Sequence, residues 1–248
     1  MIAMTIAGFD PSGGAGILND IKTFAAFGIY GTAVITALTA QNISKVTGIE
    51  PVNPDFIEKQ IEAVLEQEKI EYVKTGMLYS REIIKTVSRK ISEYDLKAVV
   101  DPVMVAGSGG FLSKKDVSES LKKYLLPLAT LTTPNIYEAQ EISGIKIETL
   151  EDAIKAAQKI GKICNVVVTG GHLEGKDVLY DGSIKIIEGE LIESSNTHGS
   201  GCSYSAAIVS SLVKGENIET AVKNAGEFVN QSIKYGGRGT LNQFWKFS

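Results

Sequence analysis

The sequence has few cysteines and histidines and no run of basic residues, and each shortage excludes a class of protein. Its two cysteines, Cys164 and Cys202, are too few for a disulfide framework, and no metal-binding cluster of Cys and His surrounds them. We therefore expect a reducing compartment. A net charge of −4 removes the electrostatic footprint of a nucleic-acid-binding protein, so no nucleic-acid partner is expected.

The pattern of a secretory signal or a membrane segment is also missing. The residues before Asp10 contain no basic n-region, which argues against a secretory signal. Residues 23–44 carry no charge and are long enough for a membrane span, but glycines, threonines, Gln41 and Asn42 interrupt them. We expect a buried helix end and a strand in this segment, and no membrane partner.

Glycine is the one residue in excess, with 25 of 248 residues or about 10%, against a usual share of about 7%. The glycines are not periodic, which excludes collagen-like and low-complexity segments. Hydrophobic residues make up 44% and charged residues 22%, a balance that suits one large core. Because there is no repeat and no Pro/Ser-rich linker, residues 1–248 are expected to form a single domain.

Short β-branched runs alternate with amphipathic helical patterns along most of the chain. This alternation predicts an α/β fold whose mostly parallel central sheet is covered by helices on both faces. The predicted strands are Met4–Gly8, Thr32–Leu38, Tyr72–Thr75, Lys97–Asp101, Thr130–Thr133 and Asn165–Thr169. The predicted helices are Gly16–Phe27, Pro54–Glu68, Ser80–Glu93, Asp116–Leu125, Asn135–Ser143, Leu150–Ile163, Gly201–Lys214 and Ile218–Tyr235. A hairpin is expected between Val178–Tyr180 and Ser183–Ile187.

The first strand is predicted to end in a Gly-rich turn, Gly8–Gly16, and to lead into a helix that carries Asp20. Glycines let backbone amides approach a ligand, and Asp20 lies one turn beyond Gly16, where it can face the same pocket. The dinucleotide fingerprint G-x-G-x-x-G fails here, because Gly14-Ala15-Gly16 is followed by Ile17-Leu18-Asn19. A ligand site and a plain turn both remain open.

A second Gly-rich segment, Gly170–Lys176, has the spacing G-x-x-x-x-G-K but is not a P-loop. Asp177 replaces the required Ser or Thr, and Val178–Tyr180 continues as a strand where a P-loop needs a helix. The turn Thr169–His172 fits a nucleotide site and a plain strand-to-hairpin connection equally well.

The strongest local signal is Asn196–Ser203, which stands directly before an apolar helix. Small residues there expose consecutive backbone N–H groups at the positive end of the helix dipole, which makes an anion hole. Cys202 lies at the same end, where the dipole favours its thiolate and makes it a candidate base or nucleophile. The alternatives are a small apolar cysteine in a helix start and a nucleophilic pair with His198.

Two acidic positions follow predicted strands. Asp101 ends a buried strand and precedes Pro102, so its carboxylate emerges where phosphates would lie. Asn135 and Glu138 are three residues apart on one helical face, and such a pair can hold Mg²⁺ through water. The same two residues also suit a capping box, which is purely structural, so both interpretations remain open.

Short segments in a fixed order along nearly the whole chain carry a family resemblance. They are Thr5–Gly8, Asp10–Gly16, Val34–Asn42, Lys74–Leu78, Asp101–Met104, Leu126–Ala129, Thr133–Asn135, Gly170–His172, Asn196–Cys202 and Leu241–Trp245. Together they resemble the ribokinase-like kinases, and among these the hydroxymethylpyrimidine/phosphomethylpyrimidine kinases of thiamine biosynthesis.

The resemblance implies a ribokinase-like three-layer α/β/α fold and a phosphotransferase activity. The γ-phosphoryl group of ATP would pass to the hydroxymethyl group of 4-amino-5-hydroxymethyl-2-methylpyrimidine, and a second one to the resulting monophosphate. Members of the family are typically cytoplasmic homodimers that need Mg²⁺. The small-molecule substrate and ATP are therefore the expected ligands.

Site residues carry over from the resemblance by motif. Asp20 and Gln41 would hydrogen-bond the aminopyrimidine. Gln41 suits the edge of the ring because its side-chain amide offers both a donor and an acceptor. The pocket around the ring would be lined by Gly8, Met77 and Val103. The anion hole and the base for the accepting hydroxyl would come from Gly199, Ser200, Gly201 and Cys202. Asp101 and Glu138 would position Mg²⁺, and the nucleotide would be bound by Asn135, Thr169 and Gly171.

A few positions depart from the family pattern. Thr169 and Gly107 stand where many members have lysine, and Phe9 stands where a smaller residue is commoner. Val105–Gly110 is expected to form a glycine-rich lid. The alternatives to pyrimidine phosphorylation are a pyridoxine/pyridoxal kinase, a non-catalytic pyrimidine-binding module, and nucleophilic hydrolysis or acyl transfer by Cys202 with His198.

Overall fold

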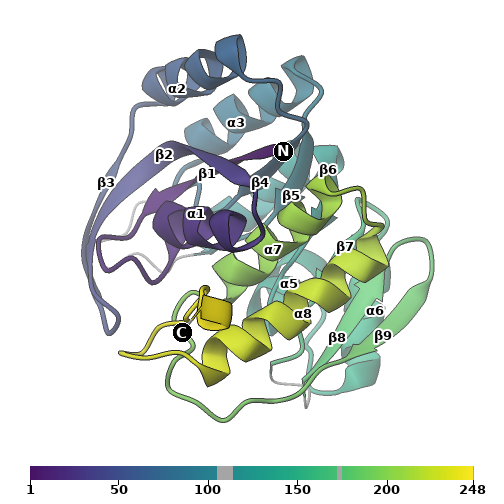
Figure 1. The fold of residues 1–248 in the computed structure, drawn as a ribbon. Helices are drawn as coiled ribbons and strands as arrows, with labels where there is room; N and C mark the ends of the chain where they lie inside the picture. The colour runs from purple at the N-terminus through teal and green to yellow at the C-terminus, as the bar shows by residue number, and fades with distance from the viewer. Residues whose placement is uncertain (105–113, 172–174, 248) are drawn as a thin grey trace.

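One sheet runs through the centre of the molecule and carries helices on both faces (Figure 1). The computed structural model describes residues 1–104, 114–171 and 175–247, and within these residues nine strands form the sheet. The strands are β1 (Ile2–Phe9), β2 (Tyr30–Gln41), β3 (Val46–Pro51), β4 (Tyr72–Thr75), β5 (Lys97–Val100), β6 (Ala129–Thr132), β7 (Val166–Val168), β8 (Lys176–Tyr180) and β9 (Ile184–Glu188). Their order across the sheet is β3-β2-β1-β4-β5-β6-β7-β8-β9.

Most of the sheet is parallel. The neighbouring strands from β2 through β1, β4, β5 and β6 to β7 pair in parallel, whereas β3 at one edge and β8 and β9 at the other pair antiparallel. Parallel strands buried on both faces read as continuous β-branched and apolar runs, which is the pattern of Ala98-Val99-Val100 and Val166-Val167-Val168. The predicted α/β class and mostly parallel sheet are therefore confirmed.

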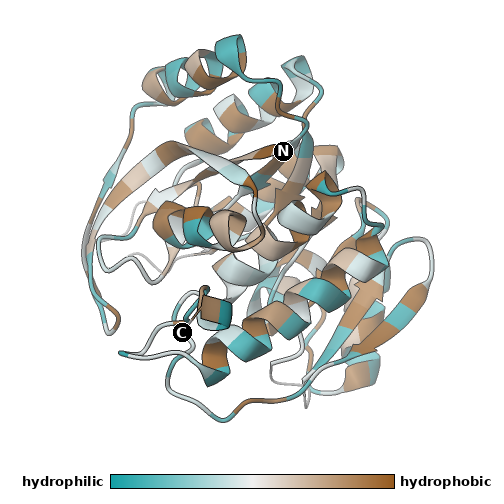
Figure 2. Ribbon diagram, in the orientation of Figure 1, coloured by the Kyte–Doolittle hydropathy of each residue, from teal (hydrophilic) through white to brown (hydrophobic). Residues whose placement is uncertain are grey.

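The helices divide between the two faces of the sheet. They are α1 (Gly16–Ala26), α2 (Pro54–Gln67), α3 (Arg81–Glu93), α4 (Lys114–Ser120), α5 (Ile136–Ser143), α6 (Leu150–Ile160), α7 (Ser200–Val213) and α8 (Ile218–Lys234). Buried side chains of α2, α3, α5 and α6 form one core with one sheet face, and those of α1, α7 and α8 form a second core with the opposite face. The arrangement is the expected three layers. Figure 2 shows the strands as mainly hydrophobic and the helices as two-sided.

The structure differs from the sequence-based expectation at two elements. The chain turns at Asn42, whose side-chain oxygen accepts hydrogen bonds from the N–H groups of Ser44 and Lys45, and returns as the unpredicted strand β3. Residues predicted as one helix over Asp116–Leu125 divide into the end of α4 and a π-helical turn, Leu121–Leu125, which a 3₁₀ turn containing Pro127 follows. Proline cannot continue an α-helical ladder, which accounts for the tightening of the last turn.

The strand order places a crevice at one end of the sheet. The chain runs from β1 to its neighbour β2, and later places β4 on the other side of β1, so the order reverses between β1 and β4. In open α/β sheets, ligands bind beyond the carboxyl ends of the strands at such a reversal. Phe9, Asp10, Gly76 and Met77 lie there.

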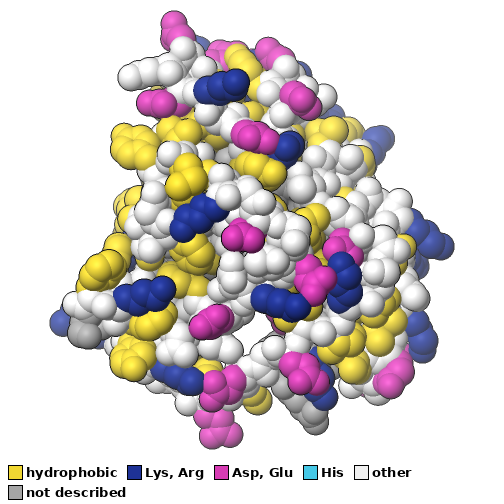
Figure 3. All heavy atoms as spheres, turned by 45° about the vertical axis from the view of Figure 1, so that its right-hand side comes forward, with side chains coloured by type: hydrophobic (Ala, Val, Ile, Leu, Met, Phe, Trp, Pro, Cys, Tyr) yellow, Lys and Arg dark blue, Asp and Glu magenta, His cyan; other side chains and the backbone are white. Residues whose placement is uncertain are grey.

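The surface mixes charges of both signs. On the face drawn in Figure 3, Lys and Arg side chains alternate with Asp and Glu. No helix in the described part of the chain is long and apolar enough to cross a membrane.

The outer helices α2 and α3 are joined by an ion-pair network. Glu58 accepts two hydrogen bonds from the Arg89 guanidinium, at 2.9 and 2.7 Å, and one of its oxygens lies 2.8 Å from the Lys90 ammonium. The Arg89 and Lys90 hydrogen bonds lower the pKa of Glu58 to about 2. The folded state therefore holds Glu58 as a carboxylate far below the pH at which an unfolded chain protonates it.

We expect Glu58→Gln to change the acid limb of the stability curve. The ordinary pKa of Glu58 is 4.5 and its folded value is about 2, so its contribution is complete above pH 4.5 and is lost as the pH falls towards 2. Urea unfolding of the variant should give a lower free energy of unfolding at pH 7 and a shallower loss between pH 4.5 and 2. Glu66→Gln, on the same helix and without an ion pair among the described residues, is the control. Parallel curves for wild type and Glu58→Gln would contradict the prediction.

Candidate active site

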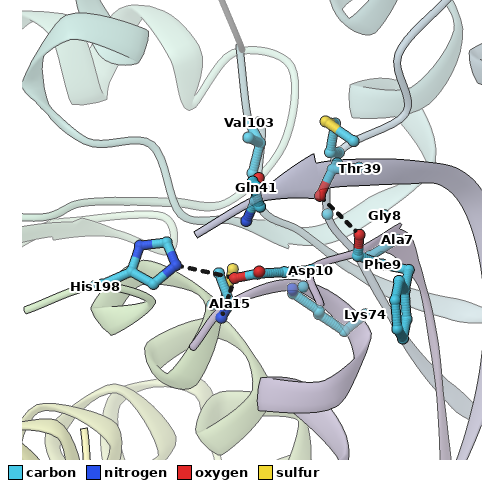
Figure 4. Close-up of a pocket in the computed structure, with 14 residues that line it drawn as sticks. Ala7, Gly8, Phe9, Asp10, Ala15, Thr39, Gln41, Lys74, Val103 and His198 are labelled. Atoms are coloured by element: carbon cyan, nitrogen blue, oxygen red, sulfur yellow. Dashed lines mark hydrogen bonds and ion pairs between the residues drawn. The ribbon is translucent and has the colours of Figure 1, made fainter. Parts of the chain in front are cut away.

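A cavity of about 190 Å³ lies beyond the ends of β1, β2 and β4, against the beginning of α7 (Figure 4). Its walls come from five segments that are far apart in the sequence. The lining residues are Ala7, Gly8, Phe9, Asp10, Ala15, Gly16, Thr39, Gln41, Lys74, Gly76, Met77, Val103, His198 and Cys202. Its walls are mainly apolar and only a few polar groups converge on it, which suits a flat aromatic ring. We therefore call this space the ring cavity.

The first turn of α7 is held against the Gly-rich turn that follows β1. Gly199 has a left-handed backbone, with φ at 86°, and a Cβ atom there would lie 1.8 Å from the carbonyl oxygen of Gly14. Only glycine permits that contact. The Asn19 amide of α1 donates a hydrogen bond of 3.1 Å to the Gly199 carbonyl oxygen. The two glycine-rich segments predicted from the sequence are therefore packed backbone to backbone.

The amides at the start of α7 are available to an anion. Most helices of the fold begin with a side-chain cap, such as Asn53, Ser80, Thr149 and Asn217, but Gly199 provides none. In the described residues the N–H groups of Gly201 and Cys202 have no acceptor. Free first-turn amides at the positive end of a helix dipole form an anion-binding site.

A second cavity, of about 490 Å³, lies on the other side of the same turn. Thr169, Gly171, Thr197, Ser200 and Gly201 contribute to its walls, together with residues of α8 and of the segment after β9. Cys202 lines the ring cavity, whereas Ser200 and Gly201 line the second cavity. The first turn of α7 is thus the shared wall of the two spaces.

The wall of the second cavity contains a buried polar pair. The Tyr204 hydroxyl donates a hydrogen bond of 2.5 Å to Asp177, whose other oxygen accepts the N–H of Gly170 at 2.7 Å. Burial raises the pKa of Asp177, and these hydrogen bonds only partly offset the effect. The pair fastens α7 to the turn after β7, in the segment whose spacing resembles a P-loop.

One lysine of the ring cavity belongs to a buried ion pair. Lys74, in β4, is fully buried and lies 2.9 and 2.8 Å from the two carboxylate oxygens of Asp20, which also accepts a 2.6 Å hydrogen bond from the Thr5 hydroxyl. Burial alone would lower the pKa of Lys74, but the neighbouring carboxylates Asp20 and Asp101 outweigh it and raise the pKa above its ordinary value. Lys74 is therefore a permanent cation.

Cys202 differs from its predicted state. The helix dipole favours a thiolate, but burial raises the pKa of the Cys202 thiol to about 12, with Asp20 and Asp101 acting in the same direction and Lys74 only partly offsetting them. In the structure Cys202 is a thiol at neutral pH. The sequence interpretation missed this effect because its main cause, the burial of Cys202, depends on packing against other elements of the fold.

Asp101 stands behind the ring cavity, at the end of β5. Its carboxylate lies 4.0 Å from Lys74 and accepts a hydrogen bond of 3.3 Å from Ser205. Burial and the neighbouring Asp20 raise the pKa of Asp101 to about 6, despite the opposing effects of Lys74 and Ser205. The cluster of Lys74, Asp20 and Asp101 therefore has two carboxyl groups and only one ammonium group.

Asn135 and Glu138 form the capping box of α5. The Asn135 side chain accepts the N–H of Glu138 at 3.0 Å, and the Glu138 side chain accepts the N–H of Asn135 at 3.0 Å. The other Glu138 oxygen accepts the Met104 N–H at 3.4 Å. The capping box is therefore present, and the described residues contain no group of three or more His, Cys, Asp or Glu side chains that could hold a metal ion by themselves.

The predicted site residues fall into three groups. Gly8, Gln41, Met77, Val103 and Cys202 line the ring cavity, and Thr169, Gly171, Ser200 and Gly201 line the second cavity. Asp20, Asp101, Asn135, Glu138 and Gly199 lie outside both linings; Asp20 reaches the ring cavity only through Lys74. The predicted lid Val105–Gly110 and His172 lie outside the described residues.

Sequence reasoning overlooked Lys74, Asp10 and Thr39. Lys74 had a usable signal, because a lysine within the apolar strand Tyr72–Thr75 requires a buried partner. His198, predicted as a possible partner of Cys202, instead places its Nε2 atom 2.9 Å from an Asp10 oxygen.

Comparisons with known proteins agree with this geometry. The family model described as phosphomethylpyrimidine kinase matches residues 10–243. A relative from Bacillus subtilis (strain 168), named hydroxymethylpyrimidine/phosphomethylpyrimidine kinase, is 39% identical over 255 residues, covering 98% of this chain and 94% of its own. A thiamine biosynthesis bifunctional protein of Geobacter sulfurreducens is 40% identical over 247 residues, covering 95% of this chain and 50% of its own. The solved structure of the pyridoxal kinase from Staphylococcus aureus in complex with AMP-PCP and pyridoxal has a TM-score of 0.89 and 34% identity, covering 98% and 93% of the two chains.

The three-layer fold and the pair of cavities that share one helix turn define a small-molecule kinase of the ribokinase-like class. Within that class, the chain belongs to the phosphomethylpyrimidine kinase family.

The Lys74–Asp20 pair can be tested by its contribution to folding. Lys74→Met leaves the Asp20 carboxylate buried and without its cation, so we expect the free energy of unfolding to fall by about 3–5 kcal/mol. Urea unfolding at pH 7 measures the change. The double variant Lys74→Met/Asp20→Asn, which removes both charges, should recover part of the loss. A loss below about 1 kcal/mol, the size of a surface pair, would contradict a buried charge pair.

Proposed function

We propose that the protein transfers the γ-phosphoryl group of ATP to the hydroxymethyl group of 4-amino-5-hydroxymethyl-2-methylpyrimidine, and then a second one to the monophosphate. One observation carries the proposal: a single turn of α7 separates a small, mainly apolar cavity from a larger one and offers free amides between them. An acceptor ring on one side and a nucleotide on the other bring the reacting oxygen and the γ-phosphate to the same amides.

The ring cavity suits the acceptor. Met77 and Val103 provide apolar contacts for a flat heteroaromatic ring, and Gln41 provides one amide that matches a ring edge carrying donors and acceptors. The names of the relatives support a pyrimidine alcohol: hydroxymethylpyrimidine/phosphomethylpyrimidine kinase for the Bacillus subtilis protein.

The second cavity suits the nucleotide. Gly171 and Thr169 place backbone and a small hydroxyl along its wall, and Ser200 and Gly201 bring the first turn of α7 to it. The Staphylococcus aureus neighbour was solved with AMP-PCP, an ATP analogue. Because Thr169 is not a lysine, we infer that backbone amides carry most of the phosphate contacts here.

The residues present suit a Mg²⁺ ion that is held mainly by phosphate oxygens. Burial is the main cause that raises the pKa of Asp101 to about 6, the neighbouring Asp20 adds to it, and a divalent cation beside Asp101 would oppose both effects. One or two carboxylates plus substrate phosphates are the usual Mg²⁺ ligands in kinases, so an all-protein cage is not required. Asp101 and Glu138 would hold it, and the ion would neutralise charge on the transferring phosphoryl group.

The amides of α7 carry more of the catalysis than Cys202 in this proposal. A thiol with a pKa of about 12 is already protonated at neutral pH and is a poor base. Phosphoryl transfer depends mainly on positioning and charge neutralisation, so a weak base costs little. Cys202 then serves to place the hydroxymethyl group beside the amides. The predicted homodimer and the cytoplasmic location stay predictions.

The reaction itself is tested by product analysis. Incubation with Mg-ATP and the pyrimidine alcohol should yield the monophosphate first and the diphosphate later, with one ADP released for each phosphate. Parallel incubation with pyridoxal tests the main rival, because the Staphylococcus aureus neighbour is named a pyridoxal kinase. A clear preference for pyridoxal would overturn the substrate assignment. Binding of the pyrimidine without ADP release would favour the non-catalytic module.

The role of the α7 amides is tested by Gly201→Pro. Proline removes the N–H of residue 201 and is tolerated in the first turn of a helix, so we expect kcat to fall about 10²–10³-fold, the usual effect of losing one anion-hole donor. Gly201→Ala is the matched control, because a Cβ atom at 201 meets no heavy atom within 4 Å and the N–H is kept. Steady-state kinetics compare the two.

Cys202→Ala compares the catalytic contribution of the thiol with that of the α7 amides. It should lower kcat more than it raises KM, but by a smaller factor than Gly201→Pro. Two results would contradict the role of the amides as the main contributors to catalysis. One is an equal kcat for Gly201→Pro and Gly201→Ala, and the other is a larger loss of kcat in Cys202→Ala than in Gly201→Pro.

A further inference from the structure

Asp10 is a buried carboxylate at the wall of the ring cavity, and it is surrounded by donors. One oxygen accepts the Ser12 N–H at 2.8 Å; the other accepts the Ser12 hydroxyl at 2.9 Å and the Ala15 N–H at 3.0 Å, and lies 2.9 Å from the Nε2 atom of His198. Only 2% of Asp10 is exposed. Since an ionised carboxylate only accepts hydrogen bonds, each of these neighbours must donate, including Nε2–H of His198.

The charge of Asp10 is secured by the same neighbours. Burial alone would raise the pKa of Asp10, but the hydrogen bonds from His198 and Ser12, with a smaller effect from the neighbouring Gln41 amide, outweigh it and hold the pKa below its ordinary value. Asp10 therefore stays an acceptor-only group at neutral pH. This settles the direction of each hydrogen bond to it.

Gln41 is the neighbour whose orientation matters to a ligand. Its side chain lines the ring cavity beside Asp10, and Figure 4 shows its amide nitrogen turned towards the Asp10 carboxylate. An amide has one NH₂ and one carbonyl end. A carboxylate attracts the NH₂ end of an amide and repels its carbonyl end, so the carbonyl oxygen of Gln41 is the end left for a ligand.

We propose that Asp10 is a positioning residue that fixes the Gln41 amide with its oxygen towards the ring cavity, and so selects rings that present an N–H donor beside the reacting hydroxymethyl group. The inference rests on the proposed function and names the feature of the substrate that the cavity reads. His198 and Ser12 act behind Asp10 by keeping it charged and immobile.

The two candidate rings differ at this position. The pyrimidine carries an amino group on the carbon next to its hydroxymethyl group, whereas pyridoxal carries a formyl group on the corresponding carbon. The amino group donates to the Gln41 oxygen, but the formyl oxygen only accepts and faces it without a hydrogen bond. A site that is built to receive a hydrogen-bond donor strongly rejects a ligand without that donor, because the acceptor of the site is then left unpaired. This rejection is stronger than that of a ligand which differs only in shape.

Asp10→Asn tests the proposal. An asparagine amide does not require a donor from Gln41, so Gln41 becomes free to turn its NH₂ towards the cavity. Calorimetric titration with the pyrimidine alcohol and with pyridoxal, without nucleotide, gives the ratio of their dissociation constants. We expect the preference for the pyrimidine to fall about tenfold or more, mainly through weaker pyrimidine binding. A partly unfolded fraction reduces the number of sites but cancels from the ratio.

Two further variants separate positioning from a general structural effect. Ser12→Ala removes a hydrogen bond to Asp10 but keeps the carboxylate, and should leave the ratio unchanged. Gln41→Ala should lose the preference, and adding Asp10→Asn to it should cause no further change in the ratio, as expected for two residues that act as one unit. An unchanged ratio in Asp10→Asn, or an equal loss for both ligands, would overturn the proposal.

A measurement on the unmodified protein covers the case in which Asp10→Asn does not fold. Nuclear Overhauser contacts from the Gln41 NH₂ protons to the His198 ring, in the complex with the pyrimidine, are expected. Contacts from these protons to the bound ring instead would overturn the proposal. If wild type binds neither ring, the proposed function fails; if it binds the pyrimidine but Asp10→Asn keeps its preference, only the role of Asp10 fails.

Discussion

The structure of the site depends on one buried ion pair, Lys74 with Asp20. It joins β4 to α1, reaches β1 through the Thr5 hydroxyl and stands 4.0 Å from Asp101 at the end of β5. Two charges taken out of water are stable only when they are paired closely and their remaining hydrogen-bonding groups are satisfied, so the pair fixes the relative placement of these elements. The surrounding electrostatics follow from it: one cation faces two carboxylates, and Cys202 beside them stays protonated.

In the proposed function, the backbone contributes more than the side chains to phosphate binding by this acidic protein. Gly199 admits the close approach of the Gly14 carbonyl, the first turn of α7 is left without a side-chain cap, and its free amides face two cavities. A net charge of −4 and the absence of lysine at 169 would otherwise argue against a site for nucleotides. Helix amides supply positive potential that a count of side-chain charges does not contain.

Local patterns predicted the sheet and the helices well, because buried strands and amphipathic helices are determined by nearby residues. They missed contacts between distant residues: Lys74 and Asp20 are 54 residues apart, and only the fold shows that the two side chains are paired. Strand β3 was missed because its residues, half-buried or exposed, lack the alternation of a core strand and depend on pairing with β2. For Asn135 and Glu138 the pattern allowed two interpretations, and the capping box formed.

The wall that the two cavities share separates two properties of the proposed enzyme, the geometry of phosphoryl transfer and the choice of substrate. In the proposed function, the distance between the phosphoryl donor and the acceptor depends on neighbouring residues of one helical turn, and the other side chains of the ring cavity affect it little. Side chains at Gln41 and around it are then free to drift towards another heteroaromatic alcohol while the transfer geometry stays intact. This offers a physical reason why proteins so similar to this chain bear the names of both a pyrimidine kinase and a pyridoxal kinase.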